Sequence, residues 1–190
     1  MKQDKTTRPD KRRRLIDAAN GLVLRQGFNK TTLAEVAAAS EVPLGGIYYY
    51  FRTKEALGAA LIEARAEGYR ALRQQWDELP EPRERLLAFI QMAVDRRDLL
   101  VQSGCPIGSL CQELRKSDGA LADCAKEMFA EFLEWLKTQF EVMGKGERSY
   151  ELAVHLMSVL EGATLLTNSF KDPYYILCEA GRMKEWVRSM

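Results

Sequence analysis

The stretch TTLAEVAAASEVPLGGIYYYFRTKEAL, residues 31–57, decides the fold of this chain. It predicts a short helix opened by the capping-box pattern TLAE at residues 32–35, then a tight turn. A very short second helix follows with Pro43 at its first position, and a third, longer helix begins after Thr53. Two short helices beside a longer supporting helix are the arrangement that places a small helix in the major groove of DNA.

Apolar residues recur at helical spacing through most of the remaining chain, and no stretch reads as a convincing strand. We therefore expect an all-α fold of about nine helices, with Asp10 as a cap of the first. The helices expected besides the two short ones cover residues 11–26, 53–78, 83–101, 106–116, 119–142, 147–169 and 173–188.

Composition indicates an ordinary globular protein, with 46% hydrophobic and 29% charged residues. No apolar run is long enough to span a bilayer, and the charged N-terminus MKQDKTTRPDKRRR lacks the apolar stretch of a signal peptide. We predict a cytoplasmic protein without a membrane partner. Residues 1–57 carry eleven Lys and Arg against six Asp and Glu, a basic surplus that suits contact with phosphate.

Residues 14–57 closely resemble the N-terminal domain of the tetracycline-repressor (TetR) family. The matching stretches are LIDAA at 15–19, QGF at 26–28, TTL at 31–33, VA at 36–37 and VPLGGIYYYFRTKEAL at 42–57. The resemblance implies a DNA-binding helix-turn-helix domain, residues 1–57, and a helical regulatory and dimerisation domain, residues 58–190. It implies a homodimeric transcriptional regulator, a repressor, that an inducer releases from a palindromic operator.

The candidate DNA-binding residues combine this resemblance with the chemistry of the second short helix. Three consecutive aromatic residues spread around a helix, so at least one must face outward, where a phenol can bond phosphate or a base edge. The usual bidentate base readers are absent between Pro43 and Phe51, which leaves thymine methyl contacts, tyrosine hydroxyls and DNA shape. The candidates are Thr32, Pro43, Leu44, Gly45, Tyr48, Tyr49, Tyr50 and Lys54, with Arg12, Arg13 and Arg14 as a DNA arm or else a solvated helix start.

The last two long helices carry broad apolar faces, and the family resemblance implies that they form the homodimer interface. Packing those faces across a two-fold axis would make a four-helix bundle. The alternative is that the same residues bury against their own chain. The candidate interface residues are Leu152, Leu156, Val159, Leu160, Ala163, Leu166, Ile176, Ala180, Met183 and Val187.

Cys105 precedes Pro106 at the expected start of a helix, where backbone amides favour the reactive thiolate. The local Gly-Cys-Pro sequence is similar to that of TetR-family members that sense electrophiles or oxidants, so Cys105 is a candidate sensor. Cys111 or Cys124 would supply a second thiol. The alternative is that Cys105 is a small buried hydrophobic residue in a structural turn.

The resemblance also implies a ligand cavity in the C-terminal domain. Met and aromatic residues suit either a helix-bundle core or an apolar pocket, and the sequence leaves both roles open. The candidate pocket residues are Phe89, Met92, Met128, Phe132, Trp135 and His155.

Catalysis is poorly supported, because the chain has a single histidine, no phosphate-binding glycine loop and no cysteine pattern with metal-ligand spacing. We expect no enzyme activity, no cofactor and no metal. The expected partners are operator DNA, a second copy of the chain, and an inducer that is either a small molecule or an electrophile. The alternative from another class is an α-helical interaction module that does not bind DNA.

Overall fold

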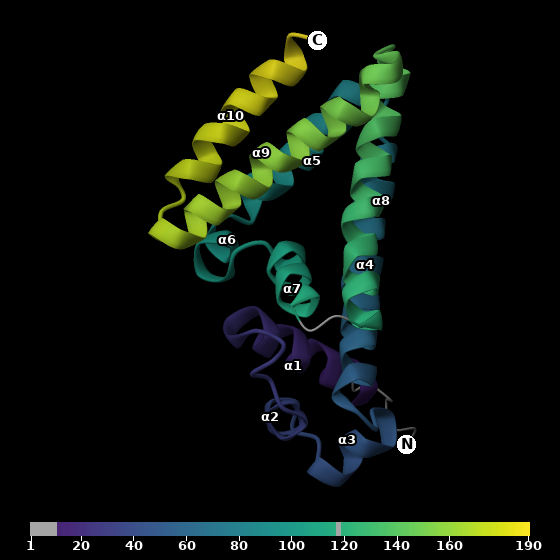
Figure 1. Ribbon diagram of the computed structural model, residues 1–190, viewed down its shortest axis with the longest axis vertical. Coiled ribbons are helices and arrows are strands. Elements are labelled where there is room, and N and C mark those ends of the chain that lie inside the picture. Colours follow the sequence, from purple (N-terminus) through teal and green to yellow (C-terminus); the bar gives the residue numbers. More distant parts are fainter. Residues whose placement is uncertain (1–10, 117–118) are drawn as a thin grey trace, which may run out of the picture. The chain divides into compact units, whose positions relative to one another are not determined.

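The computed structural model describes residues 11–116 and 119–190, and every regular element in those ranges is helical (Figure 1). Asp10, expected as a cap, lies outside the described residues. The chain divides into two compact units, of which the first ends at Arg65 and the second begins at Ala66. Among the residues described, no helix has the length and apolar character needed to cross a membrane.

The first unit contains helices α1 (Lys11–Gln26), α2 (Leu33–Ala39), α3 (Leu44–Tyr50) and the beginning of α4 (Lys54–Asp77). Gly27 adopts a φ of 85° directly after α1, a conformation that glycine allows without a Cβ clash, and so ends that helix. One face of every helix supplies the core of this unit. The buried core residues are Leu15, Ile16, Ala19, Leu22, Val23, Phe28, Val36, Ala37, Val42, Ile47, Phe51, Leu57, Leu61 and Ile62.

The second unit holds the rest of α4 and six further α-helices among the described residues. They are α5 (Pro82–Asp95), α6 (Arg97–Ser103), α7 (Pro106–Arg115), α8 (Ala120–Val142), α9 (Ser149–Phe170) and α10 (Tyr174–Arg188), with a 3₁₀ turn η1 (Gly146–Arg148) before α9. The single helix predicted for residues 83–101 is therefore wrong. Arg96 interrupts it with φ −96° and ψ 10°, which redirects the chain so that α6 packs on α9.

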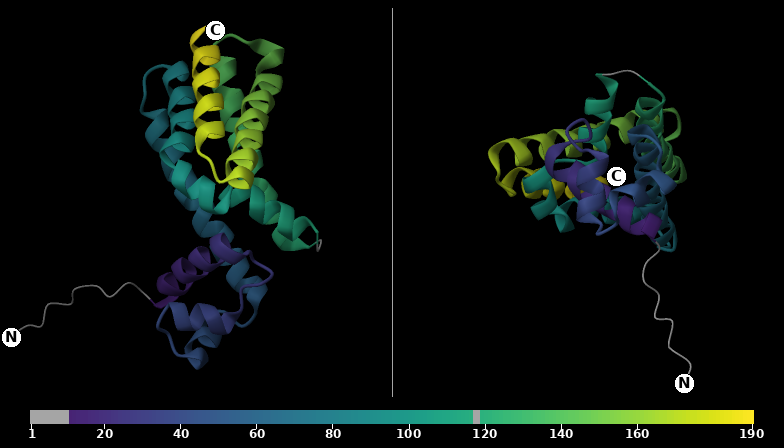
Figure 2. Two further views of the ribbon diagram at one scale, coloured as in Figure 1. Left: turned by 90° about the vertical axis from the view of Figure 1, so that its left-hand side faces the viewer. Right: turned by 90° about the horizontal axis from the view of Figure 1, so that it is seen from below.

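Helix α9 is the centre of the second unit, since it contacts α6, α8 and α10. Figure 2 shows α10 running alongside α9, and α10 also packs on α5. The backbone N–H of Ile176 donates to the hydroxyl of Thr167 over 3.0 Å, which ties the start of α10 to the end of α9. Phe132 and Leu136 of α8 and Leu156 of α9 are buried in the core of this unit.

The end of α6 is fixed to the end of α9 by side-chain hydrogen bonds. Asn168 Nδ2 and Lys171 Nζ each donate to the carbonyl of Val101 over 3.0 Å, which satisfies a carbonyl near the end of α6. Gly104 follows at φ 70°, and a Cβ there would lie 3.3 Å from the hydroxyl oxygen of Ser109. This anchored turn determines where Cys105 is placed.

Candidate functional site

Helix α2 begins with the predicted capping box, and the structure confirms both of its hydrogen bonds. The backbone N–H of Glu35 donates to the Thr32 hydroxyl over 3.2 Å, and the Thr32 N–H donates to the Glu35 carboxylate over 2.8 Å. These hydrogen bonds hold the pKa of Glu35 below its usual value, chiefly through the Thr32 hydroxyl. The hydroxyl of Thr32 is exposed, but capping already engages it as both donor and acceptor.

Several of the predicted residues on α3, the short helix labelled in Figure 1, are exposed. Leu44 and Tyr48 are about half exposed, at 49% and 50%, and Tyr49 is 83% exposed. Ile47, in contrast, is fully buried and anchors the helix to the core of the first unit. Gly45 is exposed, and a Cβ built on it would meet nothing within 4 Å, so the backbone of α3 is accessible from outside.

The remaining α3 candidates are less open. Pro43 is exposed just before the helix, whereas Tyr50 is half-buried, its ring packed edge-on against that of Tyr49 at 5.0 Å. Lys54 points back toward the loop after α1, because its Nζ donates to the carbonyl of Asn29 over 2.8 Å and lies 4.9 Å from the ring of Phe28. The ammonium group is therefore already held inside the unit.

The three arginines at the start of α1 differ in their contacts. Arg14 is half-buried and donates to the carbonyl of Ser40 and, over 3.1 Å, to the carboxylate of Glu41, so it braces the turn between α2 and α3. Arg13 pairs with Asp17 one turn further along at 3.0 Å, with both side chains exposed. Arg12 is exposed and stacks over the ring of Phe51 at 5.6 Å. Of the predicted arm, Arg12 and Arg13 are the exposed members.

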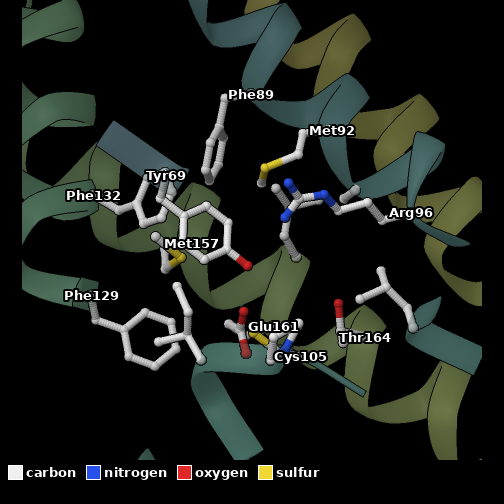
Figure 3. Close-up of a pocket in the computed structure, with 15 residues that line it drawn as sticks. Tyr69, Phe89, Met92, Arg96, Cys105, Phe129, Phe132, Met157, Glu161 and Thr164 are labelled. Carbon is white, nitrogen blue, oxygen red and sulfur yellow. The ribbon is translucent and has the colours of Figure 1, made fainter. Parts of the chain in front are cut away.

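The second unit contains a cavity that encloses about 530 Å³ of space, part of it open to solvent (Figure 3). Aromatic rings and thioethers line one side, and Cys105, Glu161 and Thr164 lie together on another. Among the predicted pocket residues, Phe89, Met92 and Phe132 line this cavity. Cys105, the candidate sensor, lines it too, whereas six labelled lining residues were not among the candidates from the sequence, namely Tyr69, Arg96, Phe129, Met157, Glu161 and Thr164.

The other three predicted pocket residues lie elsewhere. Met128 is buried in the core, and the indole N–H of Trp135 donates to the carboxylate of Asp77 over 2.9 Å. His155 is exposed on α9, with its ring 5.1 Å from that of Trp186. Met and aromatic spacing therefore located the bundle interior without distinguishing the cavity wall from the packed core.

Cys105 is the N-cap of α7, as the Cys-Pro sequence predicts, and the amide N–H of Gly108 donates to its sulfur over 3.2 Å. The inference that this geometry yields a thiolate is wrong. Burial and the neighbouring carboxylate of Glu161 raise the pKa of the Cys105 thiol far above its ordinary value, and the amide contact offsets only part of this effect. Cys105 is therefore a protonated thiol at neutral pH.

Cys111 and Cys124, the candidates for a second thiol, have no thiolate at Cys105 to react with. Cys111 is half-buried, and burial followed by the charge of Glu161 raises its pKa to about 11. Cys124 is exposed on α8. All four cysteines of the chain lie within the described residues and are free thiols.

Glu161 is the feature of the cavity that sequence reasoning overlooked. Burial raises the pKa of its carboxyl group, and the S–H of Cys105 donates to it, which acts in the opposite direction. The signal was present in the sequence, since Glu161 is the one charged residue in the run HLMSVLEGATLL at 155–166. An isolated carboxylate within an apolar helical stretch costs free energy unless something compensates for it.

The predicted dimer face requires a correction. Eight of its ten residues are buried in the core of the protomer itself, so the alternative of burial within the chain applies to them. They are Leu152, Leu156, Leu160, Ala163, Ile176, Ala180, Met183 and Val187. Only Val159, half-buried, and Leu166, exposed, reach the surface.

The apolar residues that α9 and α10 do expose have a different helical phase. The small residues Ser158 and Gly162 of α9 and Gly181 of α10 are exposed as well. A Cβ at either glycine would meet nothing within 4 Å. Six of the exposed apolar residues, here called the α9–α10 face, are Val154, Leu165, Leu166, Phe170, Tyr174 and Leu177.

An outward-facing short helix in a helix-turn-helix unit, followed by a helical unit with a cavity, defines a DNA-binding transcriptional regulator. Residues 15–61 match the sequence profile of bacterial regulatory proteins of the tetR family. Residues 82–177 match that of the C-terminal domain of LmrA/YxaF-like transcriptional regulators. The chain therefore belongs to the TetR family, and its relatives are transcriptional regulators rather than enzymes.

Individual relatives agree with this assignment. The transcriptional repressor NemR of Escherichia coli K12 is 36% identical over 98 residues, which are 49% of this chain and 48% of NemR, so the match spans about half the length of that relative. The regulator YxaF of Bacillus subtilis is 26% identical over 180 residues, 92% of this chain and 94% of YxaF. The crystal structure of a TetR regulator from Legionella pneumophila has the same fold, with a TM-score of 0.84, 22% identity, and coverage of 95% and 97% of the two chains.

Proposed function

We propose that this protein is a homodimeric repressor that binds a palindromic operator and is released from it by an inducer. Residues 1–57 bind the operator, and residues 58–190 dimerise and bind the inducer. The name of NemR, a repressor, supports the sign of regulation. In a two-fold dimer on B-DNA the two recognition helices are about 34–36 Å apart, one helical turn of duplex.

The outward face of α3 is the observation that carries this proposal. Leu44, Gly45, Tyr48 and Tyr49 are exposed together on a helix that Ile47 anchors from behind. A rigid helix with accessible backbone and two accessible phenols can enter the major groove, contact thymine methyls and donate to base edges or phosphates. Pro43 and Tyr50, at either end of the helix, complete the proposed contact surface.

Phosphate contacts are assigned to residues that flank α3. Lys54 retains N–H donors beyond the one that bonds the carbonyl of Asn29, and Arg12 and Arg13 extend cationic side chains from the start of α1. Thr32 lies at the exposed start of α2. Such contacts set the position of the protein on the duplex and make its affinity depend steeply on salt.

Dimerisation is assigned to the α9–α10 face. It leaves several large apolar side chains exposed along two neighbouring helices, and such patches on a soluble protein mark interaction sites. The exposed Gly162 and Gly181 lie in the same stretches and leave room for close helix approach. A self-complementary pairing of this face across a two-fold axis gives a four-helix arrangement.

Induction is assigned to noncovalent binding in the cavity. An inducer that binds one of two states more tightly shifts the protein toward the state with lower operator affinity. Modification of Cys105 is the second candidate, and the protonated state of that thiol weighs against it. Replacing Cys105 by Ser separates the two, because the serine hydroxyl can still cap α7 while it cannot be alkylated or form a disulfide.

Binding of the purified protein to its own upstream DNA, compared with an unrelated duplex of equal length at ~150 mM salt, tests the proposal, because nonspecific contacts are weak at that salt. We expect tight binding to the upstream fragment alone, and loss of that preference in the Tyr49→Ala variant. An equally weak affinity for both duplexes, together with no operator elsewhere in the neighbouring DNA, would favour the interaction module over the regulator.

A further inference from the structure

The cavity of the second unit holds a carboxylate among apolar groups (Figure 3). Glu161 reaches it from α9 and is the sole acidic residue among the fifteen that line it. Four aromatic rings and two thioethers provide most of the remaining wall; these are Tyr69, Phe89, Phe129, Phe132, Met92 and Met157. A charged group in such surroundings is costly unless a partner compensates its charge.

The position of the carboxylate is set by the start of α7. A Cβ at Gly108 would lie only 2.8 Å from Glu161 Oε2 and 3.3 Å from Cys105 Cβ, so a glycine at this point admits the carboxylate beside the helix. The thiol of Cys105 donates its S–H to Glu161, but a thiol is a weak donor. The thiol therefore holds Glu161 in place but supplies no opposite charge.

Arg96 is the only cationic residue of the cavity wall, and it does not compensate for Glu161. Its guanidinium lies over the ring of Tyr69, 5.1 Å from the ring centre. Within the described ranges, no ion pair joins Arg96 to Glu161. Burial accordingly raises the pKa of Glu161. The hydrogen bond from the Cys105 thiol lowers it, and no cation contributes.

We propose that the cavity binds an organic cation, a molecule with an aromatic or other apolar body and one protonated nitrogen that pairs with Glu161. The ammonium replaces the weak thiol donor with a charge-assisted hydrogen bond, which is the stronger kind. The faces of the surrounding rings also attract cations, and Met92 and Met157 adapt to the apolar body. This inference rests on the proposed function, since it names the chemical class of the inducer.

Three probes with one body and different head groups test the proposal: 4-phenylbutylamine, 4-phenylbutanol and 4-phenylbutyrate. Their binding to the full-length protein is measured by titration calorimetry without DNA. A hydrogen bond to a charged group contributes about 1.5–3 kcal/mol, so we expect the amine to bind roughly 10- to 100-fold more tightly than the alcohol. The carboxylate should bind most weakly.

Glu161→Gln keeps the size of the side chain and removes its charge, and it should bring the amine to the affinity of the alcohol. Glu151→Gln, at an exposed position on the same helix, is the matched control and should leave the difference intact. Equal binding of amine and alcohol to the wild type would overturn the proposal. Tightest binding of 4-phenylbutyrate would do so as well and would make Arg96 the anchor.

The pH dependence of amine binding to the wild type provides a second test, which does not require the variant to fold. Amine affinity should fall as pH drops toward the raised pKa of Glu161, while alcohol affinity stays constant. The other ionisable groups around Glu161 are Tyr69 on α4, Arg96, Cys105 at the N-cap of α7 and Cys111 within it. The pKa of both cysteine thiols is raised, which takes them further from that acidic range. A flat amine profile would contradict the proposal. Operator binding measured without any probe reports separately on the proposed function.

Discussion

Cys105 is a residue on which two electrostatic effects act in opposite directions. The amide N–H of Gly108, 3.2 Å from the sulfur, favours the thiolate, as helix starts generally do. Burial and the carboxylate of Glu161 favour the thiol, and they prevail. A helix N-terminus therefore does not by itself make a reactive cysteine, because the same sulfur can lie buried beside a carboxylate.

This balance predicts the order in which N-ethylmaleimide alkylates the native protein at neutral pH. Cys124 is exposed and should react before Cys105, whose raised pKa leaves almost no thiolate until the pH rises far above neutrality. Glu161→Gln should speed the labelling of Cys105 several-fold, because it removes the negative charge that opposes thiolate formation. Peptide mass spectrometry of a time course gives the order, and labelling of Cys105 first in the wild type would contradict the prediction.

Among the elements, α2 depends on its capping box. Thr32→Ala should lower the free energy of unfolding by about 1 kcal/mol, the usual cost of losing an N-cap hydroxyl. The pKa of Glu35 is lowered in the folded state. Its ionised carboxylate therefore stabilises the fold at pH values above its usual pKa of 4.5, and this stabilisation is lost as pH falls through the folded pKa. The difference between wild type and Thr32→Ala should therefore shrink in acid.

Thr53 provides the control for this pH dependence. Its hydroxyl caps α4 by accepting from the N–H of Ala56 over 3.1 Å, and no carboxylate completes a box there. Thr53→Ala should cost a similar free energy at neutral pH, with a difference from wild type that stays constant as pH falls. Denaturant unfolding followed by circular dichroism at several pH values measures both variants. Equal pH dependence of the two differences would show that Glu35 has no special part in the cap.

Helix α3 makes a separate prediction through Gly45. Alanine fits at this position without a clash and favours helix, so Gly45→Ala should stabilise the fold by roughly 0.5–1 kcal/mol. The added methyl group should still weaken operator binding, because it holds the backbone away from the groove. Gly68→Ala on α4, equally free of contacts, should gain similar stability and keep full operator affinity. Comparable operator affinities of the two variants would remove Gly45 from the proposed interface.

Sequence periodicity predicted these elements well where residues close together in the sequence pack against one another. The capping box at Thr32 follows from four consecutive residues, and Ile47 and Phe51, four residues apart, are both buried. The dimer face could not be predicted in the same way. Leu156 and Leu165 are both apolar residues of α9, but one is fully buried in its own protomer and the other is 62% exposed. Periodicity shows that a residue is apolar, whereas tertiary packing decides what covers it.

The cavity illustrates the same limit. Phe89 and Trp135 have similar sequence signals and their ring centroids are 6.4 Å apart, yet only Phe89 lines the cavity. Arg96, at the break between α5 and α6, lines it as well. The sequence has no glycine or proline at this break, so the break could not be predicted from it. Glu161 was the readable exception, an acidic residue inside an apolar helix, and it identifies the site better than any of the aromatic residues do.

At the scale of the whole molecule, one substitution on the α9–α10 face and one in the protomer core should have opposite effects on dimerisation and on stability. Leu165→Glu places a charge on the exposed face and should leave the protomer folded, while sedimentation equilibrium shows a shift from dimer to monomer. Leu156→Ala removes a fully buried side chain and should cost about 2–5 kcal/mol of unfolding free energy. The dimer of this second variant should persist under conditions in which it is folded.

Operator binding connects the two variants to function. A palindromic site is bound tightly when both recognition helices contact it at once, so the monomeric Leu165→Glu protein should lose most of its operator affinity although its α3 is unchanged. Leu156→Ala should bind the operator normally below its melting temperature. If Leu165→Glu instead remains dimeric and binds the operator fully, the partner must pack against another surface, because a glutamate at the centre of an apolar two-fold interface would meet its own copy.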